Sequence, residues 1–205
     1  MKLSRRRHLA IAAVTVGALA FPGTAVATQP ATSAPVAQES GQVAPAATVT
    51  WHLVRAENPT QDQLEAYELI TTAMNAAVTR YNDLSDLGKS ITVHYDPSVP
   101  TADGHINGTI RFGNRAYMNE RTALHEISHT IGVGQSGGWY ELSAGGTWSG
   151  AQATALVRQY DGEGASISTG GGHFWPYGLN YDNEFSQTNA DRHVRVVAAM
   201  VADGM

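Results

Sequence analysis

Cysteine is absent from this chain of 205 residues, and the absence excludes several kinds of protein. Without thiols the chain can form neither a disulfide scaffold nor a thiolate zinc finger, and it has no cysteine nucleophile. A metal ion bound here must therefore be held by nitrogen and oxygen atoms. The sequence also has no internal repeat, no Gly-x-Ser-x-Gly motif, no glycine-rich phosphate loop before a helix and no aspartate-rich calcium loop.

Acidic residues are missing from the first part of the chain: four of the first seven residues are basic, and the first acid is Glu39. An apolar run from Leu9 to Phe21 follows the basic start, and Ala25-Val26-Ala27 then forms a small-residue cleavage pattern. We predict a signal peptide over residues 1–27, because its apolar core is too short to span a membrane.

Two export routes remain open for this signal. Ser4 to Leu9 resembles the twin-arginine export signal, although His8 stands where that signal prefers a phenylalanine. The alternative is an ordinary basic region of the general secretory route. Either route predicts a secreted, extracellular protein.

Large apolar residues are scarce between residues 28 and 47, which are rich in Ala, Pro, Thr, Ser and Gln. Such a segment buries too little surface to fold, so we predict a disordered linker, followed by a single domain over residues 48–205. Removal of the four basic residues at the start changes the formal net charge from −5 to −9. An acidic protein of this kind is a poor partner for nucleic acids and anionic membranes. We expect a monomer.

Apolar residues recur with clear periods in this domain. Alternation predicts strands at 49–53, 91–95 and 110–112. An apolar stripe at helical spacing predicts a long helix that begins at the capping box Thr60-x-x-Gln63 and ends before Gly88. The remaining pattern predicts helices from 114 or 119 to 131, at 150–160 and at 188–202, with glycine-rich or loop segments at 134–146 and 165–172.

These elements predict an α+β fold. It would contain a small mixed sheet, a long packing helix and a second helix near residue 125, followed by a mostly helical and loop C-terminal subdomain.

The most informative motif is His125-Glu126-Ile-Ser-His129, which lies on a predicted helix. Two histidines four residues apart on a helix project from the same face, so both imidazoles can bind one ion. A glutamate beside the first histidine can take a proton from a water molecule that the metal activates. The motif therefore predicts a catalytic metal centre with Glu126 as general base.

This segment resembles the zincin metallopeptidases, whose N-terminal subdomain has the same order of strands and helices. His-Glu-x-x-His-x-x-Gly, ending here at Gly132, is similar to the metzincin branch. The resemblance implies a zincin-like fold, one catalytic zinc ion and a protein or peptide substrate. Two features depart from that branch: Gln135 occupies the position of its third ligand, and no methionine occurs between Met118 and Met200 to form its methionine turn.

The third metal ligand must therefore come from further along the chain. His173 is our first choice, because it follows three glycines that allow a close backbone approach to the metal. Glu184 is the second choice, since Asn183-Glu184 resembles the pair that supplies the third ligand in the gluzincin branch. Gln135, Asp182 and His193 remain open, although His193 lies between arginines on what we expect to be a solvated helix face.

The leading hypothesis is a secreted zinc endopeptidase with the metal ligands His125, His129 and His173. Glu126 would be the general base, and Tyr177 the first choice, with Tyr181, for a hydroxyl that stabilises the oxyanion. A substrate strand would pair with an edge strand expected around residues 108–113. Two alternatives remain: a zinc amidase that acts on cell-wall peptides, and a non-catalytic binding module that uses the tryptophans Trp139, Trp148 and Trp175.

Overall fold

The computed structural model of the protein describes residues 48–205. The predicted signal peptide over 1–27 and the predicted linker over 28–47 lie outside the described residues. Among the helices formed by residues 48–205, none is long and apolar enough to cross a membrane.

Four strands form one mixed sheet: β1 (Val49–Leu53), β2 (Lys89–Tyr95), β3 (Ala102–His105) and β4 (Thr109–Phe112). Their order is β1-β2-β4-β3, with β1, β2 and β4 parallel and β3 antiparallel to β4. The edge strand next to β4 is therefore β3, and our prediction of an edge strand around residues 108–113 is wrong. The four residues of β3, Ala-Asp-Gly-His, lack the alternating large apolar side chains that reveal a strand.

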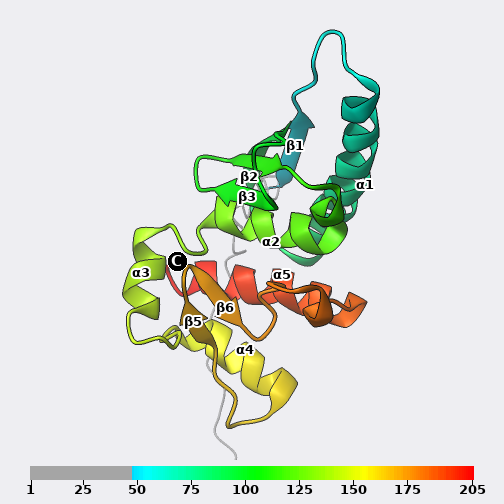
Figure 1. Cartoon of the computed structure of the whole chain (residues 1–205). Helices are drawn as coiled ribbons and strands as arrows, with labels where there is room; N and C mark the ends of the chain where they lie inside the picture. Colours follow the sequence, from blue (N-terminus) through cyan, green and yellow to red (C-terminus); the bar gives the residue numbers. More distant parts are fainter. Residues whose placement is uncertain (1–47) are drawn as a thin grey trace, which may run out of the picture. The chain divides into compact units, whose positions relative to one another are not determined.

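Two helices pack against this sheet and against each other (Figure 1). α1 (Gln61–Leu84) begins at the predicted capping box, in which Thr60 and Gln63 exchange two hydrogen bonds. α2 (Glu120–Ile131) is capped by Asn119, whose side chain accepts from the N–H of Thr122, and is buried from Arg121 to Thr130. A helix that is buried on all sides lies between two layers of structure, and α2 lies between the sheet and the C-terminal part.

The C-terminal part consists of α3 (Gly137–Ser143), α4 (Ala151–Asp161), α5 (Gln187–Ala202) and the hairpin of β5 (Ser168–Gly170) with β6 (His173–Trp175). The α+β class, with a mixed sheet followed by a mostly helical part, is confirmed. We did not predict α3 or the hairpin, because a helix of seven residues and strands of three are too short to show a period.

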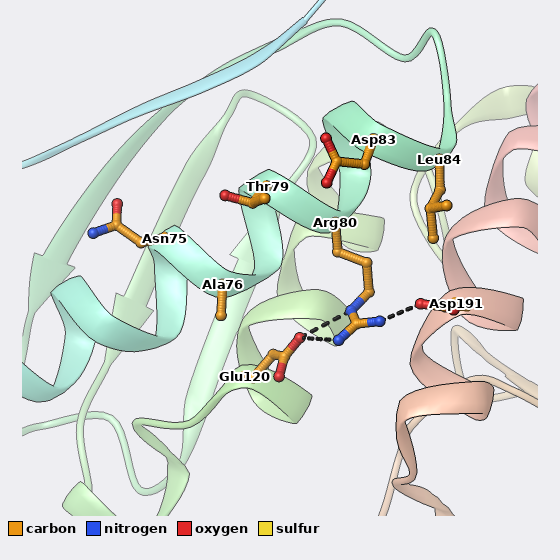
Figure 2. A pocket seen from close by; sticks show the side chains of 8 residues that line it. All are labelled: Asn75, Ala76, Thr79, Arg80, Asp83, Leu84, Glu120 and Asp191. Atoms are coloured by element: carbon orange, nitrogen blue, oxygen red, sulfur yellow. Dashed lines mark hydrogen bonds and ion pairs between the residues drawn. The ribbon is translucent and has the colours of Figure 1, made fainter.

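An arginine joins three helices on the side of the molecule drawn in Figure 2. Arg80 of α1 lies 2.8 Å from Glu120 at the start of α2 and also pairs with Asp191 of α5. These residues line a cleft of about 500 Å³ that contains none of the histidines of the sequence motif. The arginine is neutralised by its two carboxylates, so we interpret this cleft as a structural joint between helices.

Candidate metal centre

Three histidines from two distant parts of the chain meet in the structure. His125 and His129 lie one turn apart on α2, with their Nε2 atoms 3.1 Å apart. His173, at the start of β6, adds the third ring, which lies parallel to that of His125 at a centroid distance of 5.2 Å. One ligand atom from each histidine lies within 4.8 Å of the other two. The three side chains could therefore hold a metal ion.

The outer ring nitrogens of the two helical histidines have backbone acceptors. His125 Nδ1 lies 2.8 Å from the carbonyl oxygen of Gly178, and His129 Nδ1 lies 2.8 Å from that of Val133. A carbonyl can only accept, so these contacts assign the ring proton to Nδ1 in both residues. Both Nε2 atoms are then unprotonated and face each other, which is the arrangement that histidine ligands of a metal ion adopt.

Burial keeps these two histidines neutral. Loss of hydration lowers the pKa of His125 well below its usual value, and the nearby ring of His129 lowers it further. Burial also lowers the pKa of His129. Because only the neutral ring offers a lone pair, both residues are ready to bind a metal at neutral pH.

Glycines allow the loop after α2 to touch the hairpin that carries His173. Gly134 has a φ of +73°, and a Cβ at this position would lie 2.5 Å from the carbonyl oxygen of Gly172. A larger residue would therefore push the hairpin, and His173 with it, away from α2. Of the three glycines before His173, Gly172 makes the close backbone approach that we expected, whereas a Cβ at Gly170 would meet nothing within 4 Å.

The turn that holds His125 is itself fixed by a buried histidine. Tyr177 and Leu179, on either side of Gly178, have φ values of 68° and 56°, which residues other than glycine rarely adopt. The neutral ring of His193, in α5, donates from Nδ1 to the carbonyl oxygen of Tyr177 at 2.7 Å, and its Nε2 accepts from the hydroxyl of Tyr81 at 3.1 Å. Its Nε2 also lies 3.1 Å from the carbonyl oxygen of Leu124, so His193 joins the turn to α1 immediately beside His125.

His193 is fully buried, and our prediction that it lies on a solvated helix face is wrong. The buried residues of α5 include Ala190, His193, Val197 and Met200, which follow helical spacing. The sequence signal was therefore present, but the neighbouring arginines concealed it.

Acidification is expected to destabilise the protein through His193. Burial lowers the pKa of this residue from 6.5 to about 4. Between these two values the unfolded chain binds a proton at His193 and the folded chain does not. The free energy of unfolding therefore falls by about 3 kcal/mol as the pH falls through this window, whereas above it His193 contributes no pH dependence.

Urea unfolding of the metal-free wild type and of His193→Gln, at pH 7 and pH 4.5, measures this effect. The variant has no imidazole to protonate, so it should lose about 3 kcal/mol less than the wild type on acidification. Equal losses in both proteins would contradict the assignment.

Glu126 lies between two clefts that meet at the histidines. One cleft, of about 340 Å³, includes Arg121 and Tyr181, and the other, of about 270 Å³, includes Gln135. Glu126 is only 6% exposed, and burial raises its pKa to about 8, with the charge of Asp103 as a further cause. A carboxyl group with a raised pKa is suited to accept and release a proton near neutral pH.

Arg121 is a residue of the site that sequence reasoning missed. It is buried, its Nη1 donates to the carbonyl oxygen of Leu179 at 2.9 Å, and its Nε lies 2.7 Å from Asp182. Its position directly after Glu120 at the start of the motif helix gave no signal beyond an ordinary surface charge. Its positive charge opposes the rise in the pKa of Glu126.

The two tyrosines considered for the oxyanion point to different places. Tyr177 is buried, and its hydroxyl lies 2.6 Å from Asp161 and 2.7 Å from Arg192, outside both clefts at the histidines. The geometry therefore gives Tyr177 a structural contact in place of the oxyanion contact that we predicted. Tyr181 is 63% exposed and lines the larger cleft.

The other residues considered as third ligands have different partners. The side-chain amide of Gln135 binds the backbone of Gly104 and Ile106, at 2.7 Å and 2.9 Å. Glu184 accepts a hydrogen bond from the backbone of Asn180 at 3.0 Å. Among the histidine and acidic side chains of the described residues, the only group of three or more that could hold a metal ion consists of His125, His129 and His173.

Two of the three tryptophans considered for a binding surface are in the core. Trp139 and Trp148 are each 2% exposed and pack against each other at a centroid distance of 5.5 Å. Only Trp175 is partly exposed. The surface that the binding-module alternative requires is therefore reduced to a single tryptophan.

Comparison of the chain with protein-family models, with curated proteins and with solved structures finds no match.

Proposed function

We propose that the protein is a secreted zinc-dependent endopeptidase, related in fold to the zincins. The observation that carries this proposal is the position of Glu126, which lines both clefts at the point where three histidines converge. Three histidine ligands leave one position of a tetrahedral zinc ion open, as in catalytic zinc sites. Secretion rests on the predicted signal peptide alone.

The donor set fits zinc. Two nitrogen ligands of a tetrahedral zinc ion lie about 3.4 Å apart, given bonds of about 2.0–2.1 Å. The Nε2 atoms of His125 and His129 are 3.1 Å apart, and both rings are oriented by backbone carbonyls. When bound, zinc would activate a water molecule and polarise the scissile carbonyl group.

The protein's own residues then carry the protons and position the substrate. Glu126 accepts a proton from the attacking water and delivers it to the nitrogen of the leaving amine. The hydroxyl of Tyr181, in the larger cleft, is available to donate a hydrogen bond to the oxygen that becomes negative. Arg121 holds the turn at Leu179 and Asn180 against α2, and so keeps the wall of this cleft in place.

Removal and return of the metal tests this proposal. The purified protein should contain one zinc ion per chain and cleave unfolded protein substrates. Dialysis against a chelator should remove both the zinc and the activity, and added zinc should restore both. Circular dichroism of the metal-free protein serves as the control for unfolding.

The substrate panel should also contain cell-wall peptides, because the same residues could serve a wall-peptide amidase. Full activity in the zinc-free protein would exclude the proposed mechanism. Bound zinc without hydrolysis of any peptide would favour a binding module.

A further inference from the structure

The backbone groups on the free side of the edge strand can be identified from its pairing. Thr101 O accepts a hydrogen bond from Gly113 N at 2.9 Å, so Thr101 faces β4. In an antiparallel pair the residues face the neighbouring strand alternately. The backbone groups of Ala102, Gly104 and Ile106 therefore point away from the sheet, toward the side on which a further strand could be added.

Gln135 already occupies part of this free edge. Its Nε2 donates to the carbonyl oxygen of Gly104 at 2.7 Å, and its Oε1 accepts from the N–H of Ile106 at 2.9 Å. A primary amide carries one donor and one acceptor side by side, as a peptide group does. The side chain thus takes the place of one peptide unit of a neighbouring strand at this end of β3.

The side chain of Gln135 lies at the candidate active site. Gln135 lines the smaller cleft together with Glu126, His129 and His173. Ala102 lines both clefts, so this residue lies at the junction where the histidines converge. A peptide that pairs with β3 can therefore use Ala102, but at Gly104 and Ile106 it meets Gln135.

The direction of the substrate follows from the direction of the strand. Antiparallel pairing is the more stable arrangement, and β3 runs from Ala102 to His105. A peptide that pairs antiparallel with β3 has its N-terminal part near His105 and its C-terminal part near Ala102. The segment before the scissile bond is then the one that meets Gln135.

We propose that Gln135 determines substrate specificity, an inference that rests on the proposed function. Its side chain limits backbone pairing of the substrate on the N-terminal side of the scissile bond. The preferred substrates are peptides that extend mainly on the C-terminal side, toward the larger cleft. Pairing before the scissile bond ends after about two residues, the separation of Ala102 from Gly104 along the strand.

Two peptide series that share one cleavage site test this inference. One series is lengthened residue by residue before the scissile bond and the other after it. In the wild type, kcat/KM should rise with C-terminal length and stay constant beyond the second N-terminal residue. In Gln135→Ala, further N-terminal residues should raise kcat/KM by about 5- to 30-fold, the effect of one or two peptide hydrogen bonds.

Gln135→Glu provides a second variant of nearly the same size, which cannot donate to the carbonyl oxygen of Gly104. Because its carboxylate can still accept from the N–H of Ile106, it frees only the carbonyl oxygen of Gly104, and its gain should be smaller than that of the alanine variant. Zinc content should be unchanged in both variants, because the side chain of Gln135 is paired with the backbone of Gly104 and Ile106.

Hydrogen exchange at the amide of Ile106 gives a readout independent of turnover. This amide should exchange slowly in the wild type and faster in Gln135→Ala. In a Glu126→Gln, Gln135→Ala double variant, a peptide with a long N-terminal side should protect it again. Absence of that protection, or equal gains from N-terminal length in wild type and variants, would overturn the inference. Failure of the proposed function can be told apart from these two outcomes, because the wild type would then cleave no peptide of either series.

Discussion

Replacement of Glu126 by glutamine should lower kcat by about 100- to 10,000-fold while zinc remains bound, because the contribution of a general base is of this size. The amide has the shape of the carboxyl group but cannot accept a proton from water. Glu126 is buried and none of the three converging histidines depends on its charge for a hydrogen bond, so the fold should be retained.

Steady-state kinetics on a single peptide substrate, with zinc analysis of the same samples, measures this effect. Glu141→Gln is the matched control, because it makes the same chemical change on an exposed residue of α3 and should leave kcat unaltered. A Glu126→Gln enzyme that kept its kcat within a few fold would show that another group accepts the proton.

The parts of the fold that could be predicted are those that local sequence determines. The capping box at Thr60 and Gln63 fixes the start of α1 through contacts three residues apart. Strand β3 could not be predicted in the same way. It pairs beside β4 although its residues have little strand propensity, because Gly104 fits closely over α2, where a Cβ would lie 2.3 Å from the carbonyl oxygen of Glu126.

The candidate site also has a part that local sequence predicts and a part that depends on the fold. His125 and His129 share a helix face whatever the rest of the chain does, so their convergence follows from spacing alone. The location of His173 beside them depends on contacts between distant glycines, which a sequence suggests but does not fix. The direction of the Tyr177 hydroxyl depends on Asp161 and Arg192, from two other helices, and no local pattern contains that information.

Gln135 has a structural role at a position where the metzincin pattern has a metal ligand. In the metzincin pattern this position would carry a metal ligand, and here an amide binds the edge strand. The loop after α2 therefore has a fixed position without metal, because hydrogen bonds to Gly104 and Ile106 hold it. The proposed third ligand, His173, can then come from the hairpin, which contacts the same loop at Gly134.

Replacement of His173 by alanine should weaken zinc binding by about 100- to 1,000-fold. Structural zinc sites with four ligands have apparent binding free energies of about 10–16 kcal/mol, so one ligand contributes roughly 2.5–4 kcal/mol. The ring of His173 is the only potential ligand from the hairpin in the converging set, and after its removal only the two histidines of α2 remain. Two ligands on one helix cannot enclose the ion.

Competition with a chromophoric chelator measures the affinities of the wild type, His173→Ala, Gln135→Ala and Glu184→Gln. The last two variants remove the rival ligands. We expect both to bind zinc as the wild type does, because the side chains of Gln135 and Glu184 are hydrogen-bonded to the backbone elsewhere. Near-UV circular dichroism of the metal-free proteins shows whether the hairpin keeps its packing. If Glu184→Gln lost zinc and His173→Ala retained it, the third ligand would be Glu184, while the pair His125 and His129 would stand. The experiment therefore separates the helix motif, which spacing alone predicts, from the hairpin ligand, which depends on the fold.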